Sequence, residues 1–273
     1  VGAPIDYNFP VRRADNDRQT DQLTVTKPFV TPANLLDNMQ QSLGNLSPKD
    51  FNHDNMDITI GKMASYIVET YMPDLLAVHF IGLDHAQHDV GRDGREVQHA
   101  LDVIDSMLNA VFTAYEKAGL MNNTDVIITG DHGFVSVKNN ISPNTLLYKA
   151  GLITDKDWKA RFLSTGGSAF LYLKDKNDQQ TLNKVIQLLN DVAPADKKHF
   201  NIIERAELDK MGVNPEVALA LAANNAAALN ANTDGALIKK RKATNGSHGH
   251  DPRMPELFTG FIGYGPSFKS GVS

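Results

Sequence analysis

Cysteine is absent from this chain of 273 residues, which excludes disulfide bonds, thiolate metal sites and a cysteine nucleophile. No uninterrupted apolar run approaches the length of about eighteen residues that a membrane-spanning helix needs. Basic residues are rarely adjacent: the longest run is KKRK at 239–242, and the net charge is −5, from 27 basic and 32 acidic residues. We therefore do not expect a basic surface that binds nucleic acid.

What is present is ordinary for a folded chain. Hydrophobic residues make up 41% and charged residues 22%, a balance that excludes wholesale disorder. The length is enough for one full-sized α/β domain. No internal repeat or low-complexity linker marks a boundary, so we expect one domain over residues 1–273.

Hydrophobic periodicity predicts helices that alternate with buried strands. Apolar residues recur every three or four positions over 56–71 and again over 95–118. The segment 75–81 is a continuous apolar run of strand length, and DVIITG at 125–130 is predicted as a second buried strand. This order is typical of βαβ units, so we expect an α/β fold with a largely parallel central sheet and helices on both faces. The alanine-rich segment at 215–231 fits a helix or a strand equally well.

The first candidate site follows the apolar run at 75–81. Asp84 and His88 stand four residues apart in the segment DHAQH, a spacing that lets two side chains converge on one ion from a helical turn. A carboxylate oxygen beside imidazole nitrogens is a typical donor mix for Zn²⁺ or another divalent ion. The alternative is that both are solvated loop residues.

Two further groups contain histidine and aspartate. Asp131 and His132 directly follow the run at 125–130, and open α/β sheets bind ligands at the carboxyl ends of their strands. The alternative there is a helix-capping Asp with an incidental His. His248, His250 and Asp251 lie in a glycine-rich segment near the end of the chain. Together, the three groups could hold two ions about 4 Å apart. Such a pair of ions stabilises the attacking and the leaving oxygen when a phosphate ester is hydrolysed.

Several segments, in order along the chain, resemble the type I phosphodiesterase/nucleotide pyrophosphatase family of the alkaline phosphatase superfamily. They are VGAPIDYN at 1–8, GLDHAQHDVG at 82–91, ITGDHGF at 128–134, STGGSAFLYLKD at 164–175 and HGHDPRMPELFTGFIGYGPSFKSG at 248–271. The resemblance implies an alkaline-phosphatase-like fold. It also implies a hydrolase of phosphate diesters or nucleotides that uses two zinc ions, other divalent metals being alternatives.

The resemblance also assigns the metal ligands. Asp84, His88 and His248 match the residues that bind the first zinc in the family, and Asp131 and His132 match residues that bind the second. The family usually has Tyr where this chain has His250. His248 and His250 are therefore both candidates for one ligand, and we favour His248 because the Gly-x-Asp that follows it matches the family only in that register. We expect His250 to lie just outside the ligands or to face the substrate, and Asp251 to orient a ligand.

No segment matches the family's Thr or Ser nucleophile, which the resemblance places upstream of residue 1. We therefore expect a C-terminal portion of a longer enzyme, with no catalytic residue of its own. Such a portion would expose an apolar sheet face and pair with its missing N-terminal half. An exported, periplasmic location is implied by resemblance only. The alternatives are a phosphonate hydrolase or phosphomonoesterase of the same superfamily, and a non-catalytic metal-binding fragment.

Overall fold

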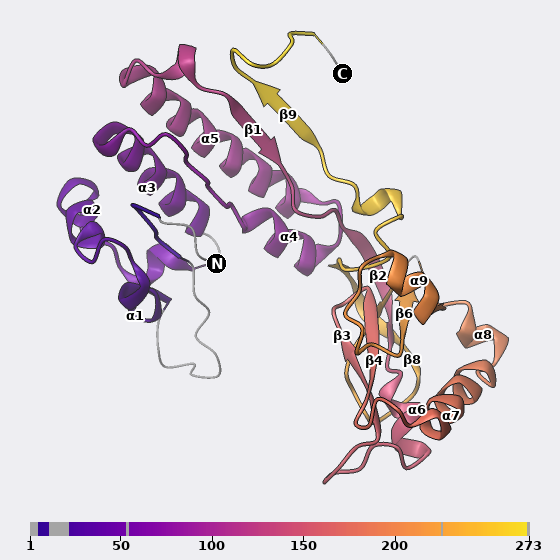
Figure 1. Ribbon diagram of the computed structural model, residues 1–273. Helices are drawn as coiled ribbons and strands as arrows, with labels where there is room; N and C mark the ends of the chain where they lie inside the picture. The colour runs from indigo at the N-terminus through magenta and orange to yellow at the C-terminus, as the bar shows by residue number, and fades with distance from the viewer. Residues whose placement is uncertain (1–4, 11–21, 53–54, 225, 272–273) are drawn as a thin grey trace. The chain divides into compact units, whose positions relative to one another are not determined.

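The structure, a computed structural model, describes residues 5–10, 22–52, 55–224 and 226–271 (Figure 1). Residues 1–4 of the segment at 1–8 therefore lie outside the described residues. By its internal contacts the chain divides into two compact units, each assembled from segments distant in sequence. The first unit comprises residues 1–86, 95–127 and 263–273, and the second comprises residues 87–94 and 128–262. The single-domain interpretation stays a prediction.

The first unit is mainly helical. Its helices are α1 (Gln22–Thr26), η1 (Lys27–Phe29), α2 (Leu35–Leu43), η2 (Pro48–Phe51), α3 (Met56–Tyr71), the start of α4 (Gly82–Val90), α5 (Arg95–Lys117) and η3 (Met121–Asn123). The helix predicted over 56–71 is confirmed as α3, which packs its apolar face on α2 through Met39, Met63 and Ile67. No helix among the described residues is long and apolar enough to cross a membrane.

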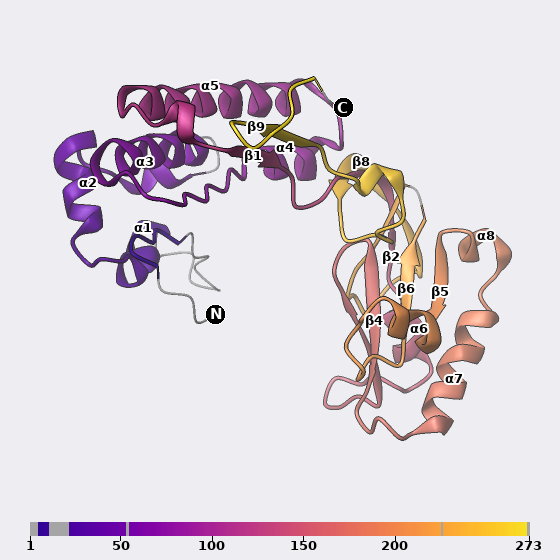
Figure 2. The same cartoon turned by 45° about the horizontal axis from the view of Figure 1, so that its top comes forward.

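α3 and α5 lie side by side (Figure 2). Gly61 of α3 allows this close approach, because a Cβ atom there would lie 2.7 Å from the side chain of Met107. The helix predicted over 95–118 is confirmed as α5, which ends just before Gly119. Gly119 has a φ of 71°, a left-handed conformation that glycine adopts at helix C-termini without strain.

The second unit contains a four-stranded sheet in the order β3-β4-β6-β5. The strands are β3 (Ala160–Ser164), β4 (Ser168–Leu173), β5 (Phe200–Glu204) and β6 (Leu219–Ala223), with α7 (Gln179–Asn190), α8 (Pro194–Lys197) and α9 (Arg205–Lys210) between them. One face packs Phe162 and Leu171 against Val185 and Leu189 of α7. The other face packs Ala220 against α9. Helices therefore lie on both faces of this sheet.

A three-stranded sheet in the order β7-β2-β8 completes the second unit. Its strands are β2 (Val135–Ile141), β7 (Ala227–Leu229) and β8 (Ile238–Ser247), and α6 (Asn144–Lys149) follows β2. The end of β8 lies opposite the start of β2, with Ser247 facing Val135. β8 therefore delivers the segment that begins at His248 to the amino end of β2.

β1 (Val126–Thr129) and β9 (Phe261–Tyr264) form a two-stranded sheet, with η4 (Pro255–Leu257) shortly before β9. Ile127, Phe261 and Ile262 on these strands are between 59% and 64% exposed. The pair therefore presents apolar side chains to solvent.

The strand pairing differs from the expected largely parallel sheet. The four-stranded sheet is antiparallel throughout. In the three-stranded sheet β2 pairs with β8 in antiparallel and with β7 in parallel orientation. Residues 75–81, predicted as a strand, have no regular secondary structure, and Leu75 is 87% exposed. Because no neighbouring strand in the described part of the chain supplies backbone partners there, the expected parallel βαβ pairing does not form.

Candidate metal centre

α4, which contains the first predicted ligands, is anchored at its start by a carboxylate from another helix. Asp57 of α3 is buried, and its Oδ1 and Oδ2 accept hydrogen bonds from the backbone N–H groups of Ile81 (2.8 Å) and Gly82 (2.9 Å). A carboxylate in this position satisfies N–H groups that have no partner within the helix and favours the helix dipole. Sequence reasoning missed Asp57, because only the fold brings it to a helix that begins 25 residues later.

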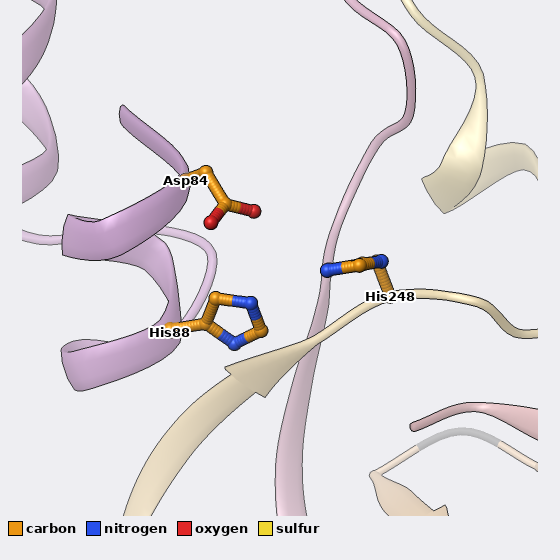
Figure 3. Close-up of side chains that lie close together, drawn as sticks. All are labelled: Asp84, His88 and His248. Atoms are coloured by element: carbon orange, nitrogen blue, oxygen red, sulfur yellow. The ribbon is translucent and has the colours of Figure 1, made fainter. Parts of the chain in front are cut away.

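Asp84 and His88 lie one turn apart on α4, so both side chains project from the same face (Figure 3). His248 reaches the same place from the segment that follows β8. One possible ligand atom from each of the three residues lies within 4.8 Å of the others, and all three residues are half-buried. One carboxylate oxygen and two imidazole nitrogens at this separation fit a single Zn²⁺ bound through bonds of about 2.0–2.2 Å.

The second unit determines how the His88 ring is held. Nδ1 lies 3.3 Å from the carbonyl oxygen of Gly246, the last residue but one of β8. Since a carbonyl can only accept, Nδ1 must donate, which leaves the lone pair on Nε2 for a metal. α4 approaches β8 so closely that a Cβ atom on Gly246 would lie 2.0 Å from the carbonyl oxygen of Gln87. Glycine at 246 is therefore a steric requirement of the site.

Aromatic rings pack around these ligands. The rings of His132 and His248 are stacked, with centroids 3.8 Å apart and planes 12° apart, and the His88 ring lies 5.1 Å from that of His248. Phe134, which is buried, contacts all three histidine rings at centroid distances of 5.0–5.5 Å. The three imidazoles thus share one apolar support that restricts their rotation.

The structure places the predicted second pair beside the first group but not within it. His132 stacks on His248, whereas the Asp131 carboxylate is 72% exposed and lies 3.7 Å from Nε2 of His132. Gly133, which completes the Asp-His-Gly motif, donates its N–H to Leu257 O at 2.9 Å. A Cβ atom on Gly133 would lie 2.2 Å from the carbonyl oxygen of Glu256, so the motif's glycine is needed for close backbone packing.

His250 and Asp251 lie close in sequence to His248 but have other partners. His250 is 4% exposed, its Nε2 donates to the carbonyl oxygen of Ala227 at 2.8 Å, and burial lowers its pKa below the ordinary value of 6.5. Asp251 accepts two hydrogen bonds from the Arg253 guanidinium, at 2.9 and 2.6 Å. These bonds lower the pKa of the Asp251 carboxyl. Both residues thus fasten the loop that presents His248.

The chain is similar to known proteins in sequence and in fold. The sequence model of the type I phosphodiesterase / nucleotide pyrophosphatase family matches residues 8–251, a range that includes every predicted ligand. Ectonucleotide pyrophosphatase/phosphodiesterase family member 7 of Rattus norvegicus is 24% identical over 204 residues, which cover 72% of this chain and 43% of that protein. The protein of the same name from Homo sapiens is 26% identical over 203 residues, covering 73% and 41%.

Among solved structures, murine ectonucleotide pyrophosphatase / phosphodiesterase 5 aligns with a TM-score of 0.59 at 18% sequence identity, covering 77% of this chain and 53% of that one. An inactive variant of that protein, solved in complex with AMP, aligns equally well. This likeness shows that the fold is the alkaline-phosphatase-like α/β fold. The chain spans about half the length of the proteins it matches. By the extent of the family match, the chain belongs to the type I phosphodiesterase / nucleotide pyrophosphatase family.

Proposed function

We propose that this chain supplies the zinc-binding part of a phosphoric diester hydrolase of the nucleotide pyrophosphatase/phosphodiesterase type. The observation that supports this most directly is the convergence of Asp84, His88 and His248 from α4 and the end of β8. These residues are the ones that the family resemblance assigns to the first zinc. A zinc ion there would polarise a phosphoryl oxygen and neutralise negative charge as it develops.

In this proposal each residue of the site has a distinct task. Asp84 supplies an anionic ligand, and His88 supplies Nε2 because Gly246 holds the proton on Nδ1. His248 supplies the third ligand and is held by stacking on His132. Phe134 keeps water away from one side of the three rings, which strengthens electrostatic interactions at the site.

Asp131 and His132 are proposed as part of a second zinc site. The carboxylate of Asp131 is exposed and its Oδ1 accepts only the backbone N–H of His132 among the bonds described, at 3.1 Å. Such a side chain can turn toward an ion at little cost in free energy. The nucleophile is proposed to be a Thr or Ser hydroxyl in polypeptide outside residues 1–273, which would also pair with this chain.

The proposed substrate is a small-molecule phosphate diester or nucleotide, and the proposed location is outside the cytoplasm. The second suggestion rests on the "ecto" in the names of the matching proteins. The alternative activities are those of a phosphonate hydrolase and of a phosphomonoesterase of the same superfamily. The alternative to an enzymatic function is a metal-binding fragment without activity.

The test uses the complete gene product that contains this chain, loaded with zinc. We expect kcat/KM to be highest for bis(4-nitrophenyl) phosphate and lower for 4-nitrophenyl phosphate and for 4-nitrophenyl phenylphosphonate. Chelation should abolish turnover, and added zinc should restore it. A preference for the monoester or the phosphonate would replace the proposed activity by that alternative, and inactivity on all three would contradict an enzymatic role.

His88→Ala and Asp84→Asn should each lower turnover of the diester by at least about tenfold, because each removes a metal-binding group. His99→Ala is the matched control, since His99 is exposed on α5 and is not one of the proposed ligands. Equal losses in all three variants would mean that the effect is one of folding and not of the site.

A further inference from the structure

The start of α4 is held by a side chain of another helix and not by one of its own. A helix commonly begins at Ser, Thr, Asp or Asn, whose side chain accepts a hydrogen bond from the first N–H groups. The segment HFI at 79–81, which leads into α4, contains none of these residue types. The carboxylate of Asp57 accepts those bonds instead, at 2.8 Å from Ile81 N and 2.9 Å from Gly82 N.

The Asp57 carboxylate fits closely against this backbone. Asp57 is 4% exposed and lies in the first turn of α3, and a Cβ atom on Gly82 would lie 2.6 Å from its Oδ2. Glycine at 82 therefore lets the carboxylate reach the two N–H groups. Burying a carboxylate costs free energy unless hydrogen bonds compensate for it. Here two backbone N–H groups do so, and the first turns of α3 and α4 both favour a negative charge.

A carboxylate from another helix fixes the position of α4, which a capping residue within α4 would not do. Strand pairing cannot fix it, because residues 75–81 form no strand in the described part of the chain. α3, in contrast, packs on α5 and contributes to the apolar cluster against which the Ile81 side chain packs. Asp57 therefore ties the first turn of α4 to the packed helices of the first unit.

That first turn contains the proposed ligand Asp84. The carbonyl oxygen of Ile81 accepts a hydrogen bond from His85 N at 3.2 Å, and this bond closes the turn around Asp84. The Ile81 residue is thus bonded to Asp57 through its N–H and to His85 through its carbonyl. Because helix geometry is regular, any shift of this turn also moves the Asp84 carboxylate. Bonds from zinc to oxygen are about 2.0–2.2 Å long, so even a small shift weakens binding.

We infer that Asp57 is a positioning residue of the metal centre: it holds the first turn of α4 and thereby fixes the place of the Asp84 carboxylate. It acts through Asp84 and does not bind the metal. This inference rests on the proposed function, because it takes Asp84 as a zinc ligand. Loss of the Asp57 carboxylate should therefore reduce zinc affinity by way of Asp84, in addition to any loss of stability.

A double-variant cycle tests this, with zinc affinity measured by calorimetric titration of the full 273-residue chain. Asp57→Asn turns an NH₂ donor toward the N–H groups of α4, and we expect it to weaken zinc binding about tenfold, as for other residues that orient ligands. Asp84→Asn removes the ligand itself. Adding Asp57→Asn to Asp84→Asn should then change the affinity by less than about twofold, because residues that act through one another are not additive.

The matched control is Thr59→Val, a change on the same helix. Thr59 is 5% exposed and its Oγ1 donates to the carbonyl oxygen of Asp50 at 2.7 Å, so the control removes a buried hydrogen bond that does not involve α4. We expect both Asp57→Asn and Thr59→Val to unfold at lower urea concentrations. Only Asp57→Asn should weaken zinc binding and alter the absorption spectrum of bound Co²⁺, which depends on ligand geometry. Equal effects of the two variants, or a further loss of more than about twofold in the double variant, would overturn the inference.

Gly82→Ala tests the same contact should Asp57→Asn not fold. The added Cβ atom would displace Oδ2 of Asp57, whereas alanine is the better helix former, so we expect weaker zinc binding with α4 retained. Unchanged zinc affinity in Gly82→Ala would contradict the role of the contact. If Asp84→Asn itself leaves zinc affinity unchanged, the proposed metal centre fails together with this inference. If Asp84→Asn weakens binding and Asp57→Asn does not, this inference alone fails.

Discussion

At the residue scale, the chemistry of the site depends on which nitrogen of each imidazole stays unprotonated. His88 donates Nδ1–H to the Gly246 carbonyl and so keeps Nε2 for a metal, whereas His250 donates Nε2–H to the Ala227 carbonyl inside the sheet. Two histidines close to one another in the fold are therefore prepared for different tasks by the carbonyl groups beside them.

The spacing of Asp84 and His88 fits two side chains on one face of a helix, but from the spacing alone both could equally be solvated loop residues. The choice of His248 over His250 rests on the register of the family motif, in which Gly249 and Asp251 follow His248. What separates them is tertiary: Gly167 lies against the His250 ring, where a Cβ atom would lie 2.2 Å from Nδ1.

This difference leads to a ranking of variants. His248→Ala should weaken zinc binding by about tenfold or more, because it removes a proposed ligand. His250→Ala should change zinc affinity less, yet it should lower the free energy of unfolding by about 1–3 kcal/mol, because the buried Ala227 carbonyl loses its partner. Calorimetric titration with zinc and urea unfolding measure the two effects, with His99→Ala as control. The reverse ranking of zinc affinities would assign the ligand to His250.

At the element scale, helices and strands with a strong periodic pattern could be predicted, and those with a weak one could not. The segment at 215–231 has enough alanine for a helix, yet Leu219–Ala223 forms β6, in which all five residues are buried. Its place between β4 and β5 decides this, because both neighbours offer backbone partners and small side chains fit between the two packed faces. No property of the segment alone contains that information.

The contact between α4 and β8 is the element-level feature on which the site depends most. Gly246→Ala would place a Cβ atom 2.0 Å from Gln87 O and 2.8 Å from the Phe134 ring. Because one of these groups is backbone, α4 must move, and we expect a loss of about 1–3 kcal/mol in the free energy of unfolding together with weaker zinc binding. Urea unfolding and zinc titration measure this. Gly260→Ala should be nearly neutral, because nothing lies within 4 Å of its Cβ position.

The start of α7 supplies a pH-dependent contribution to stability. Hydrogen bonds from Thr181 Oγ1 (2.6 Å) and from Thr181 N (2.9 Å) lower the pKa of the Asp178 carboxyl below its ordinary value of 3.8. The unfolded chain therefore binds a proton more readily than the folded chain. The stabilisation is fully present above the ordinary pKa and is lost as the pH falls through the lower folded pKa.

Asp178→Asn keeps an oxygen at the helix cap but removes the charge. We expect the wild type to be the more stable at neutral pH, and the gap between the two proteins to shrink below about pH 3.8. Urea unfolding at intervals from pH 7 to pH 3 measures the gap. A gap that stays constant over this range would contradict the role of the charge.

At the scale of the whole molecule, the α/β class and the family could be predicted, whereas the strand order could not. An apolar run indicates where a strand can form but not whether it finds a partner or which strand that is: residues 75–81 form no strand, and the pairings β2–β8, β3–β4, β4–β6 and β5–β6 are antiparallel. The family resemblance predicts that Asp84, His88 and His248 come together, and the structure brings these three residues together. The bulge in the pairing of β2 with β8 could not be predicted, since only the paired strands define it.

Zinc should stabilise the whole chain if the site binds it as proposed, because the ligands come from α4 and from the segment after β8. At a zinc concentration of 100 times the Kd, linkage gives about 2.7 kcal/mol. For a chain of this size that corresponds to a rise in Tm of roughly 5–10 °C. Differential scanning calorimetry with zinc and with a chelator measures it. His248→Ala should lose the shift, and a shift of equal size in that variant would place the zinc elsewhere.

The apolar side chains on β1 and β9 have a practical consequence for the colloidal behaviour of the protein. Ile127, Phe261 and Ile262 lie on two adjacent strands and are mostly exposed. Exposed apolar patches promote self-association, and salts such as sulfate strengthen apolar attraction because they are excluded from protein surfaces. The salts that tighten the folded interior should therefore also bring this protein out of solution, and mild detergent should keep it dispersed.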